Sequence, residues 1–191
     1  MKVLFTSLLL LTCWSISKSQ TFNYNPSSDQ PYGKLNPDAP KNTADYAELI
    51  GSSTCKSVSR LDPTTWSDTV NMKWVFKYIM NGNGVQDETS KEDGTYSGSI
   101  RQYNADSSAW YVHYYTSSKA SPQLPAWSGN REGTKITLYK DQKAPNGFDG
   151  YYKIVFSDIS EDSFNWSGAW VSKDESVVYP TWRIYCNKDK D

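Results

Sequence analysis

Hydrophobic and polar residues alternate along most of the chain after Gly51, in short segments that end at clusters of turn residues. In one such segment Trp74, Phe76 and Tyr78 alternate with lysine and valine. A period of two is typical of a β-strand that buries one face. Short turns rich in Asn, Asp and Gly separate the segments. The pattern predicts about nine strands, at residues 54–60, 70–80, 84–90, 95–104, 110–117, 134–140, 150–157, 163–171 and 181–187.

The region before the strands has a different pattern and predicts two other elements. Residues 20–43 are rich in Asn, Ser, Pro and Asp, and their closely spaced prolines exclude regular structure. We therefore expect an extended N-terminal arm there. Residues 43–50 predict a short helix with Thr43 as N-cap and with Tyr46 and Leu49 on one face.

One connection is longer than the others. Residues 118–133 contain Pro122, Pro125 and Trp127 and show no clear alternation. A connection of this length predicts a lid or a loop at the mouth of a cavity. Trp127 is then a candidate ligand gate.

An antiparallel meander of this kind has two sheet edges, and closing it into a barrel removes both. We therefore predict that residues 44–191 form a single closed antiparallel barrel. Closure makes the first and last strands neighbours, and these strands carry Cys55 and Cys186. A disulfide between them would close a loop of about 130 residues, which the chain-entropy model values at roughly 5 kcal/mol. A two-sheet sandwich could also bring these strands together, and two unpaired buried thiols are the other possibility.

The first 19 residues have the pattern of an export signal. Lys2 precedes an apolar run at residues 3–11, and Ser17 and Ser19 supply small residues before a cleavage site at Gln20. We therefore expect a signal peptide at residues 1–19 and a secreted or periplasmic protein. The alternative is a lipoprotein anchored at Cys13. The apolar run is shorter than the ~20 residues needed to cross a bilayer, so we expect no transmembrane segment.

Charge and composition exclude several function classes. The chain has 191 residues, with 20 Lys and Arg against 21 Asp and Glu. This balance, without a basic patch, gives no footprint for nucleic acid. A single histidine, His113, argues against a structural zinc site. We therefore expect no metal and no cofactor, and nothing in the sequence specifies an oligomeric state.

Aromatic residues are unusually frequent, with 8 Trp, 14 Tyr and 6 Phe. Rings that line an apolar pocket or stack on sugars would account for more of them than core packing alone. The predicted partner is thus a small molecule, carbohydrate-derived or lipophilic. Candidate ligand-binding residues are Arg101, Tyr103, Trp110, Tyr111, His113, Tyr115, Trp127, Trp166 and Trp170.

The register of one predicted hairpin decides which candidates share a face. If Tyr103 lies opposite Trp110, then Arg101 lies opposite Val112, and His113 falls on the other face; a slip of one residue reverses this. A histidine among tyrosines could be a general base, a ligand contact, a haem ligand or an ordinary hydrogen-bonded strand residue.

Two carboxylates are candidates to assist His113. Asp87 and Glu88 are adjacent on a predicted strand and therefore point to opposite faces, so one of them can face the cavity. Solvated surface charge is the alternative interpretation for both.

Four motifs resemble those of a known family. They are residues 49–51, residues 78–87, residues 99–103 with the following Trp110, and residues 156–168. Together they resemble the calycin-like, lipocalin-type β-barrels of a bacterial domain-of-unknown-function family (number fifteen seventy-nine), over about residues 46–188. The resemblance implies a barrel with a possible ligand cavity, and no established reaction. The chain has Ala169 where that family often has Glu, so a role for that carboxylate is lost.

Three hypotheses follow for the function. The first is an exported barrel that binds a small molecule in a ring-lined cavity. The second is a lyase, isomerase or hydrolase on the same scaffold, with His113 as base and Asp87 or Glu88 assisting. The third is a surface or partner-binding module whose interior is filled and holds no cavity.

Overall fold

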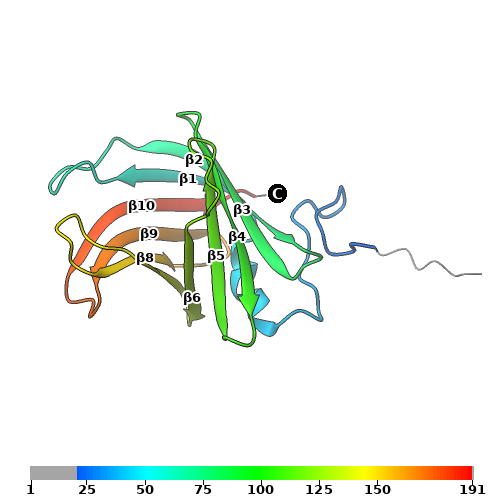
Figure 1. Ribbon diagram of the computed structural model, residues 1–191. Coiled ribbons are helices and arrows are strands. Elements are labelled where there is room, and N and C mark those ends of the chain that lie inside the picture. Colours follow the sequence, from blue (N-terminus) through cyan, green and yellow to red (C-terminus); the bar gives the residue numbers. More distant parts are fainter. Residues whose placement is uncertain (1–20, 191) are drawn as a thin grey trace, which may run out of the picture.

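A computed structural model describes residues 21–190, so the predicted signal peptide and Cys13 lie outside the described residues. The chain forms a closed antiparallel meander barrel, in which each strand pairs with its neighbours in sequence and β1 pairs with β10 (Figure 1). No helix within residues 21–190 is long and apolar enough to cross a membrane. The elements are the 3-10 helix η1 (Lys41–Leu49) and the strands β1 (Gly51–Ser59), β2 (Val70–Ile79), β3 (Gly84–Lys91), β4 (Tyr96–Asn104), β5 (Ala109–Thr116), β6 (Ala126–Glu132), β7 (Lys135–Asp141), β8 (Gly150–Ser157), β9 (Ser163–Ser172) and β10 (Val178–Lys188).

The predicted all-β barrel is confirmed, with ten strands instead of about nine. The additional strand is β6, which lies inside the segment that the sequence predicted as a long loop. Its Ser, Gly and Asn residues have low β-propensity, so the strand is specified by pairing with β5 and β7 and not by local preference. Gly129 permits this pairing, because a Cβ there would lie 2.0 Å from the carbonyl oxygen of Thr137. The remaining β5–β6 connection covers only residues 117–125.

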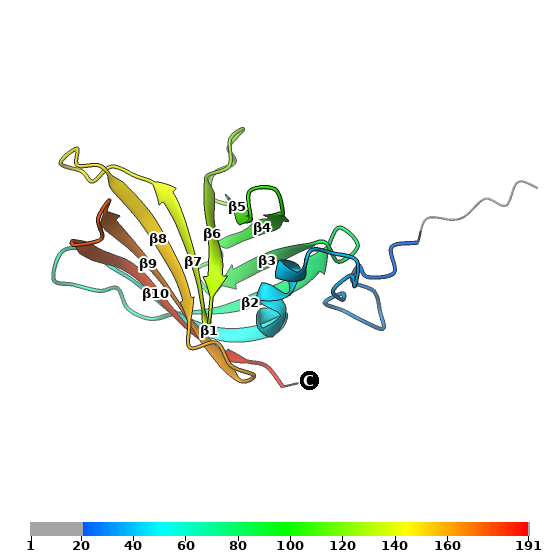
Figure 2. The ribbon, with the colours of Figure 1, turned by 90° about the horizontal axis from the view of Figure 1, so that it is seen from below.

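The barrel has a closed end and an open end (Figure 2). The β2–β3, β4–β5, β6–β7 and β8–β9 turns lie at the closed end, together with η1. The longer connections, at residues 60–69, 117–125 and 142–149, lie at the open end. Along each strand every second side chain points inward, as the period of two predicted.

Helix η1 covers the closed end. Tyr46 and Leu49 are fully buried, and the Tyr46 ring packs edge-on against Trp110 at 4.8 Å between centroids. The Trp110 indole N–H donates to Asp45 at 2.9 Å. The prediction that Thr43 is the N-cap is wrong: the helix begins earlier, with Pro40 in the cap position, and Thr43 is buried inside it.

The predicted disulfide is confirmed. Cys55 and Cys186 lie directly opposite each other across the β1–β10 pairing and are bonded. Both are buried, so the bond joins the first and last strands from inside the barrel.

Both ends of the described chain lie at the closed end. The Tyr24 N–H of the N-terminal arm donates to Asn81 in the β2–β3 turn at 3.0 Å. At the other terminus the Asp189 N–H donates to the carbonyl of Ser52, near the start of β1, at 2.9 Å.

Strands β6 and β7 separate toward the open end. Their last pair on that side is Ser128 with Tyr139, so Trp127 and Lys140 are not paired across the two strands. Figure 2 shows the strands diverging from the closed end upward. Strand β6 remains paired with β5 at this point, where Trp127 lies opposite Val112. The β6–β7 ladder therefore ends before it reaches Trp127 and Lys140.

Candidate functional site: a ring-lined cavity

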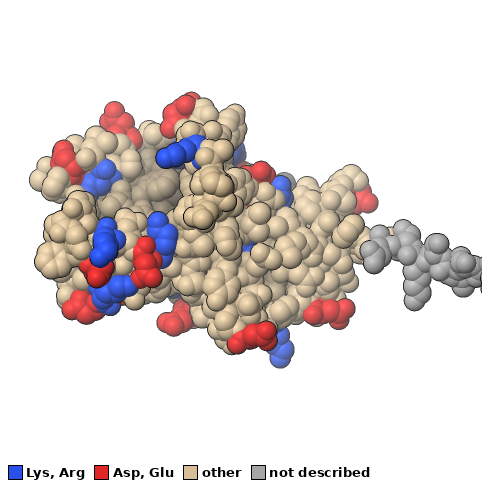
Figure 3. All heavy atoms as spheres, in the orientation of Figure 1, with Lys and Arg blue, Asp and Glu red and all other residues tan. Residues whose placement is uncertain are grey.

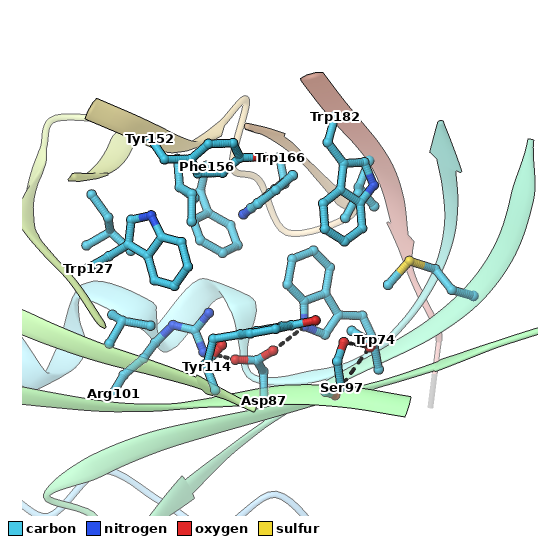
Figure 4. A pocket seen from close by; sticks show the side chains of 17 residues that line it. Trp74, Asp87, Ser97, Arg101, Tyr114, Trp127, Tyr152, Phe156, Trp166 and Trp182 are labelled. Carbon is cyan, nitrogen blue, oxygen red and sulfur yellow. Dashed lines mark hydrogen bonds and ion pairs between the residues drawn. The ribbon is translucent and has the colours of Figure 1, made fainter. Parts of the chain in front are cut away.

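A cavity of about 160 Å³ occupies the half of the barrel nearest the open end. It opens toward the loop-bearing end, where the space-filling view is hollowed between two groups of loops (Figure 3). Aromatic and aliphatic side chains make most of its wall, and polar groups gather on one side (Figure 4). The lining residues are Met72, Trp74, Asp87, Thr89, Ser97, Ser99, Arg101, Val112, Tyr114, Trp127, Leu138, Tyr152, Ile154, Phe156, Trp166, Trp182 and Ile184.

Three tryptophans, Trp127, Trp166 and Trp182, line the part of the cavity nearest the open end. Trp166 and Trp182 meet edge-on with their ring centroids 5.1 Å apart. The Trp182 indole N–H donates to Ser57 at 2.7 Å, which fixes the ring orientation. Trp127 is 8% exposed, and its indole N–H has no hydrogen-bond partner within residues 21–190. A buried donor without a partner costs free energy, so Trp127 offers a hydrogen bond that a ligand or water can use.

The floor of the cavity is a buried ion pair. Asp87 on β3 accepts hydrogen bonds from Arg101 on β4 and from the Trp74 indole N–H, the latter at 2.7 Å. The side chains of Asp87 and Arg101 are each only 3% exposed. Because each charge neutralises the other, the floor is polar and carries no net charge.

Aromatic rings surround the Arg101 guanidinium. It lies 5.1 Å from the ring centroids of both Tyr46 and Phe76 and 5.7 Å from that of Phe156. Burial lowers the pKa of Arg101, and burial likewise raises the pKa of Tyr46. Arg101 therefore joins the helix that covers the closed end to the floor of the cavity.

Hydroxyl groups supply the remaining polar surface. Thr89 and Ser97 share a hydrogen bond of 2.7 Å on the β3–β4 wall. On the opposite wall the Tyr152 hydroxyl shares one of 2.9 Å with Thr181. Burial raises the pKa of Tyr152, so this phenol stays neutral at physiological pH.

Two lysines stand above the tryptophans at the open end. The Lys140 ammonium lies 4.8 Å from the Trp127 ring centroid, and the Lys91 ammonium lies 4.6 Å from that of Trp182. Each lysine ends an inward-facing row of its strand, β7 and β3 respectively. They are thus at the rim of the cavity and not inside it.

The structure brings four of the predicted site residues into the cavity wall: Asp87, Arg101, Trp127 and Trp166. The prediction that Trp127 belongs to a long lid or mouth loop is wrong, because Trp127 is a buried residue of strand β6.

The other predicted residues lie elsewhere. Trp110 is fully buried below the cavity and Tyr103 packs on it edge-on. Trp170 stands at the open end, where its indole N–H donates to the Gln142 carbonyl. Four residues sit on the outer face or at the surface: Glu88, Tyr111, His113 and Tyr115.

The predicted register of the β4–β5 hairpin is confirmed. Tyr103 pairs with Trp110, Arg101 with Val112, and Ile100 with His113. Arg101 and Val112 point into the barrel, so His113 points out of it, away from Asp87. Glu88 also points outward and forms an ion pair with Lys77 at 2.9 Å.

Several cavity residues were not predicted as site residues, chiefly Trp74, Tyr114, Tyr152 and Trp182. Their signal was present as period-two alternation, which places Trp74 in one row with Met72 and Trp182 in one row with Ile184. Alternation identifies a buried face, but it does not tell which part of that face is filled and which part surrounds a space.

The fold is a closed antiparallel meander barrel of the lipocalin-like type, and one comparison with a solved structure agrees with this fold. The structure of Rv2717c from M. tuberculosis superposes with a TM-score of 0.55 at 10% sequence identity, over 80% of this chain and 100% of that one. An S-type phycobiliprotein lyase, CPES from Guillardia theta, gives a TM-score of 0.43 at 10% identity, over 77% of this chain and 92% of that one. At these identities the comparison concerns the fold alone. The chain matches no protein-family model and no curated protein.

Proposed function

We propose that this protein is an exported barrel that binds a small apolar or aromatic molecule in the cavity. The observation that carries the proposal is the cavity itself: about 160 Å³ of space among Trp127, Trp166 and Trp182, above a polar floor. Ligand sites are typically concave, mostly apolar, and fitted with a few polar groups that orient the ligand. The third hypothesis, a module with a filled interior, predicted no such space.

The size of the cavity narrows the ligand. A dry cavity of about 150 Å³ accommodates a molecule the size of benzene. On the polar floor, Asp87 already accepts hydrogen bonds from Arg101 and Trp74, and the Arg101 Nε–H is a buried donor without a partner within residues 21–190. A carbohydrate would bring more hydroxyl groups than the wall can pair, so the lining favours a lipophilic or aromatic ligand over a carbohydrate-derived one.

One further feature supports the proposal. The disulfide is compatible with an extracellular or periplasmic location, in keeping with the export signal expected at residues 1–19. The motif resemblance to the bacterial family of unknown function stays an expectation, because no family model matches the chain.

No observation favours catalysis by His113 in this cavity, because His113 lies on the opposite face of β5. The groups that face the cavity and could exchange a proton are Asp87, Tyr114 and Tyr152. Asp87 is engaged by two donors. We therefore propose binding and not turnover.

The test introduces the same replacement, isoleucine to tryptophan, once on the inner face and once on the outer face of the barrel wall. Ile154 lines the cavity, whereas Ile100 points outward from β4. We expect Ile154→Trp to fill the space and to lower the affinity for a neutral probe, phenylacetamide, at least tenfold by calorimetry. Ile100→Trp adds the same side chain outside and should leave the affinity within twofold.

Native mass spectrometry of protein purified from its exported fraction gives an independent result. We expect a bound mass that denaturation releases. Failure of the wild-type protein to bind phenylacetamide or toluene at millimolar concentration, together with an empty native mass, would contradict the proposed function.

A further inference from the structure

We propose that the ligand is a small aromatic carboxylate, whose ring enters the cavity and whose anionic group is held at the rim by Lys91 and Lys140. This inference rests on the proposed function and names the chemical class of its ligand.

The position of each lysine is set by the strand that carries it. On β3 the inward row runs Asp87, Thr89, Lys91, and on β7 it ends at Lys140 after Leu138. A strand that continues an inward row to the open end places that side chain at the cavity rim. Both ammonium groups therefore face the same opening from different parts of the wall.

Each ammonium lies over a tryptophan that lines the cavity. The distances to the ring centroids are 4.6 Å for Lys91 over Trp182 and 4.8 Å for Lys140 over Trp127. A cation over an indole face is attracted by its quadrupole. These contacts hold the two charges directly above the rings that would contact an aromatic ligand.

Neither ammonium has a hydrogen bond or ion pair with any residue in the described part of the chain. Both side chains are nevertheless half-buried. Three other lysines toward the open end differ, because they have carboxylate partners: Lys143 pairs with Asp149, Lys153 with Glu175, and Lys173 with Asp141.

The carboxylates nearest to Lys91 in sequence accept hydrogen bonds from other groups. Glu92 accepts from the Asn71 amide at 3.0 Å, and Asp93 accepts from the Thr95 N–H at 2.9 Å. The hydrogen bonds from Thr95 lower the pKa of Asp93, and the charge of Lys91 adds to this effect. The buried Arg101 is neutralised by Asp87. Within residues 21–190 no carboxylate forms an ion pair with Lys91 or Lys140, so both ammonium groups can pair with an incoming anion.

The separation of β6 and β7 leaves room for the anionic group on the Lys140 side. Lys140 lies one residue beyond the last pair of the β6–β7 ladder, beside Trp127 and its unpartnered indole N–H. A carboxylate has two oxygens and can accept from several donors at once. Lys140, Lys91 and the Trp127 indole are donors of the kind it needs.

The experiment compares two nearly isosteric probes, phenylacetate and phenylacetamide, by calorimetry at low salt. We expect phenylacetate to bind at least tenfold more tightly. Lys140→Gln and Lys91→Gln should each lower the affinity for phenylacetate several-fold, and the double variant should remove the preference. Affinity for phenylacetamide should stay within twofold in all three variants.

Lys143→Gln and Lys173→Gln are matched controls, because these two other lysines toward the open end have carboxylate partners. They should leave the preference for phenylacetate unchanged. Equal binding of both probes, or an equal effect of the control variants, would overturn the anionic head group while leaving the proposed function intact. If neither probe binds to the wild-type protein, the proposed function itself fails.

Discussion

The two ends of the barrel interior contain the same kinds of side chain but arrange them differently. At the closed end, Tyr46, Phe76 and Trp110 are fully buried; the Tyr46 ring packs edge-on against Trp110, and Phe76 packs edge-on against Phe156. At the open end, Trp127 and Trp166 are each 8% exposed and face a cavity. A surplus of aromatic residues thus serves two purposes within one barrel.

The difference shows that ring content alone does not define a binding site. The closed end is filled because a helix supplies Tyr46 and Leu49 to its opening. Among residues 21–190, the open end has loops but no covering helix. Between them, the ion pair of Asp87 and Arg101 forms a boundary that belongs to both: its upper side lines the cavity and its lower side contacts Tyr46.

The largest expected effect tests whether the two ends unfold as one unit. Replacing Cys55 and Cys186 together by Ala should lower the free energy of unfolding by roughly 5 kcal/mol, because the disulfide closes most of the described chain into a loop. Urea melts measure the change. Hydrogen exchange should show protection falling at both ends, and loss confined to the open end would divide the barrel into two units.

The next effect separates the filled end from the hollow end. Phe76→Ala at the closed end removes a fully buried ring and should cost about 3–5 kcal/mol. Trp182→Ala removes a half-buried ring that already faces a space, and we expect about a third of that cost. Urea melts of both variants test this, and equal costs would show that the open end is as tightly packed.

The boundary pair gives an effect of about 3 kcal/mol. Asp87→Ala leaves the Arg101 charge buried without its partner, which is strongly destabilising. The double variant Asp87→Leu with Arg101→Met removes both charges and should recover most of the loss. If the double variant is no more stable than Asp87→Ala, packing and not charge explains the effect.

A smaller effect concerns alkaline pH. Burial raises the pKa of Tyr78, at the closed end of β2, to about 12. Between pH 10 and 12 the unfolded chain has lost this proton while the folded protein keeps it, so the stability falls as pH rises above 10. Urea melts at pH 9 and 11 test the direction, and Tyr78→Phe should weaken the dependence.

The last substitution should have no effect on ligand affinity. His113→Ala changes the outer face of β5, and it should leave phenylacetamide affinity within twofold. Calorimetry measures it. A loss of more than tenfold would show that the outer face takes part in binding.

Much of the fold could be predicted because it depends on alternation. The closed meander, the Cys55–Cys186 bond and the placement of Arg101 and His113 on opposite faces are all indicated by a period of two together with short turns. Strand β6 could not be predicted in this way. Its Ser128, Gly129 and Asn130 favour a loop locally, and only the neighbouring strands make them a strand.

The site was only partly predictable for a related reason. Asp87, Arg101 and Trp166 were recognised as candidates by residue type. The rim lysines were not, although Lys91 and Lys140 end inward rows that the alternation already indicated. Lysine at the end of a strand usually extends into solvent, and its position over a tryptophan depends on contacts between strands distant in sequence.

The placement of both ends of the described chain at the closed end has a practical meaning for any tether. A linker, tag or support joined just before residue 21 or just after residue 190 would attach near the β2–β3 turn or the start of β1. The mouth of the cavity would then point away from the attachment, toward free solution. The barrel can therefore be immobilised from either of these two positions for sensing or capture without obstructing the entrance.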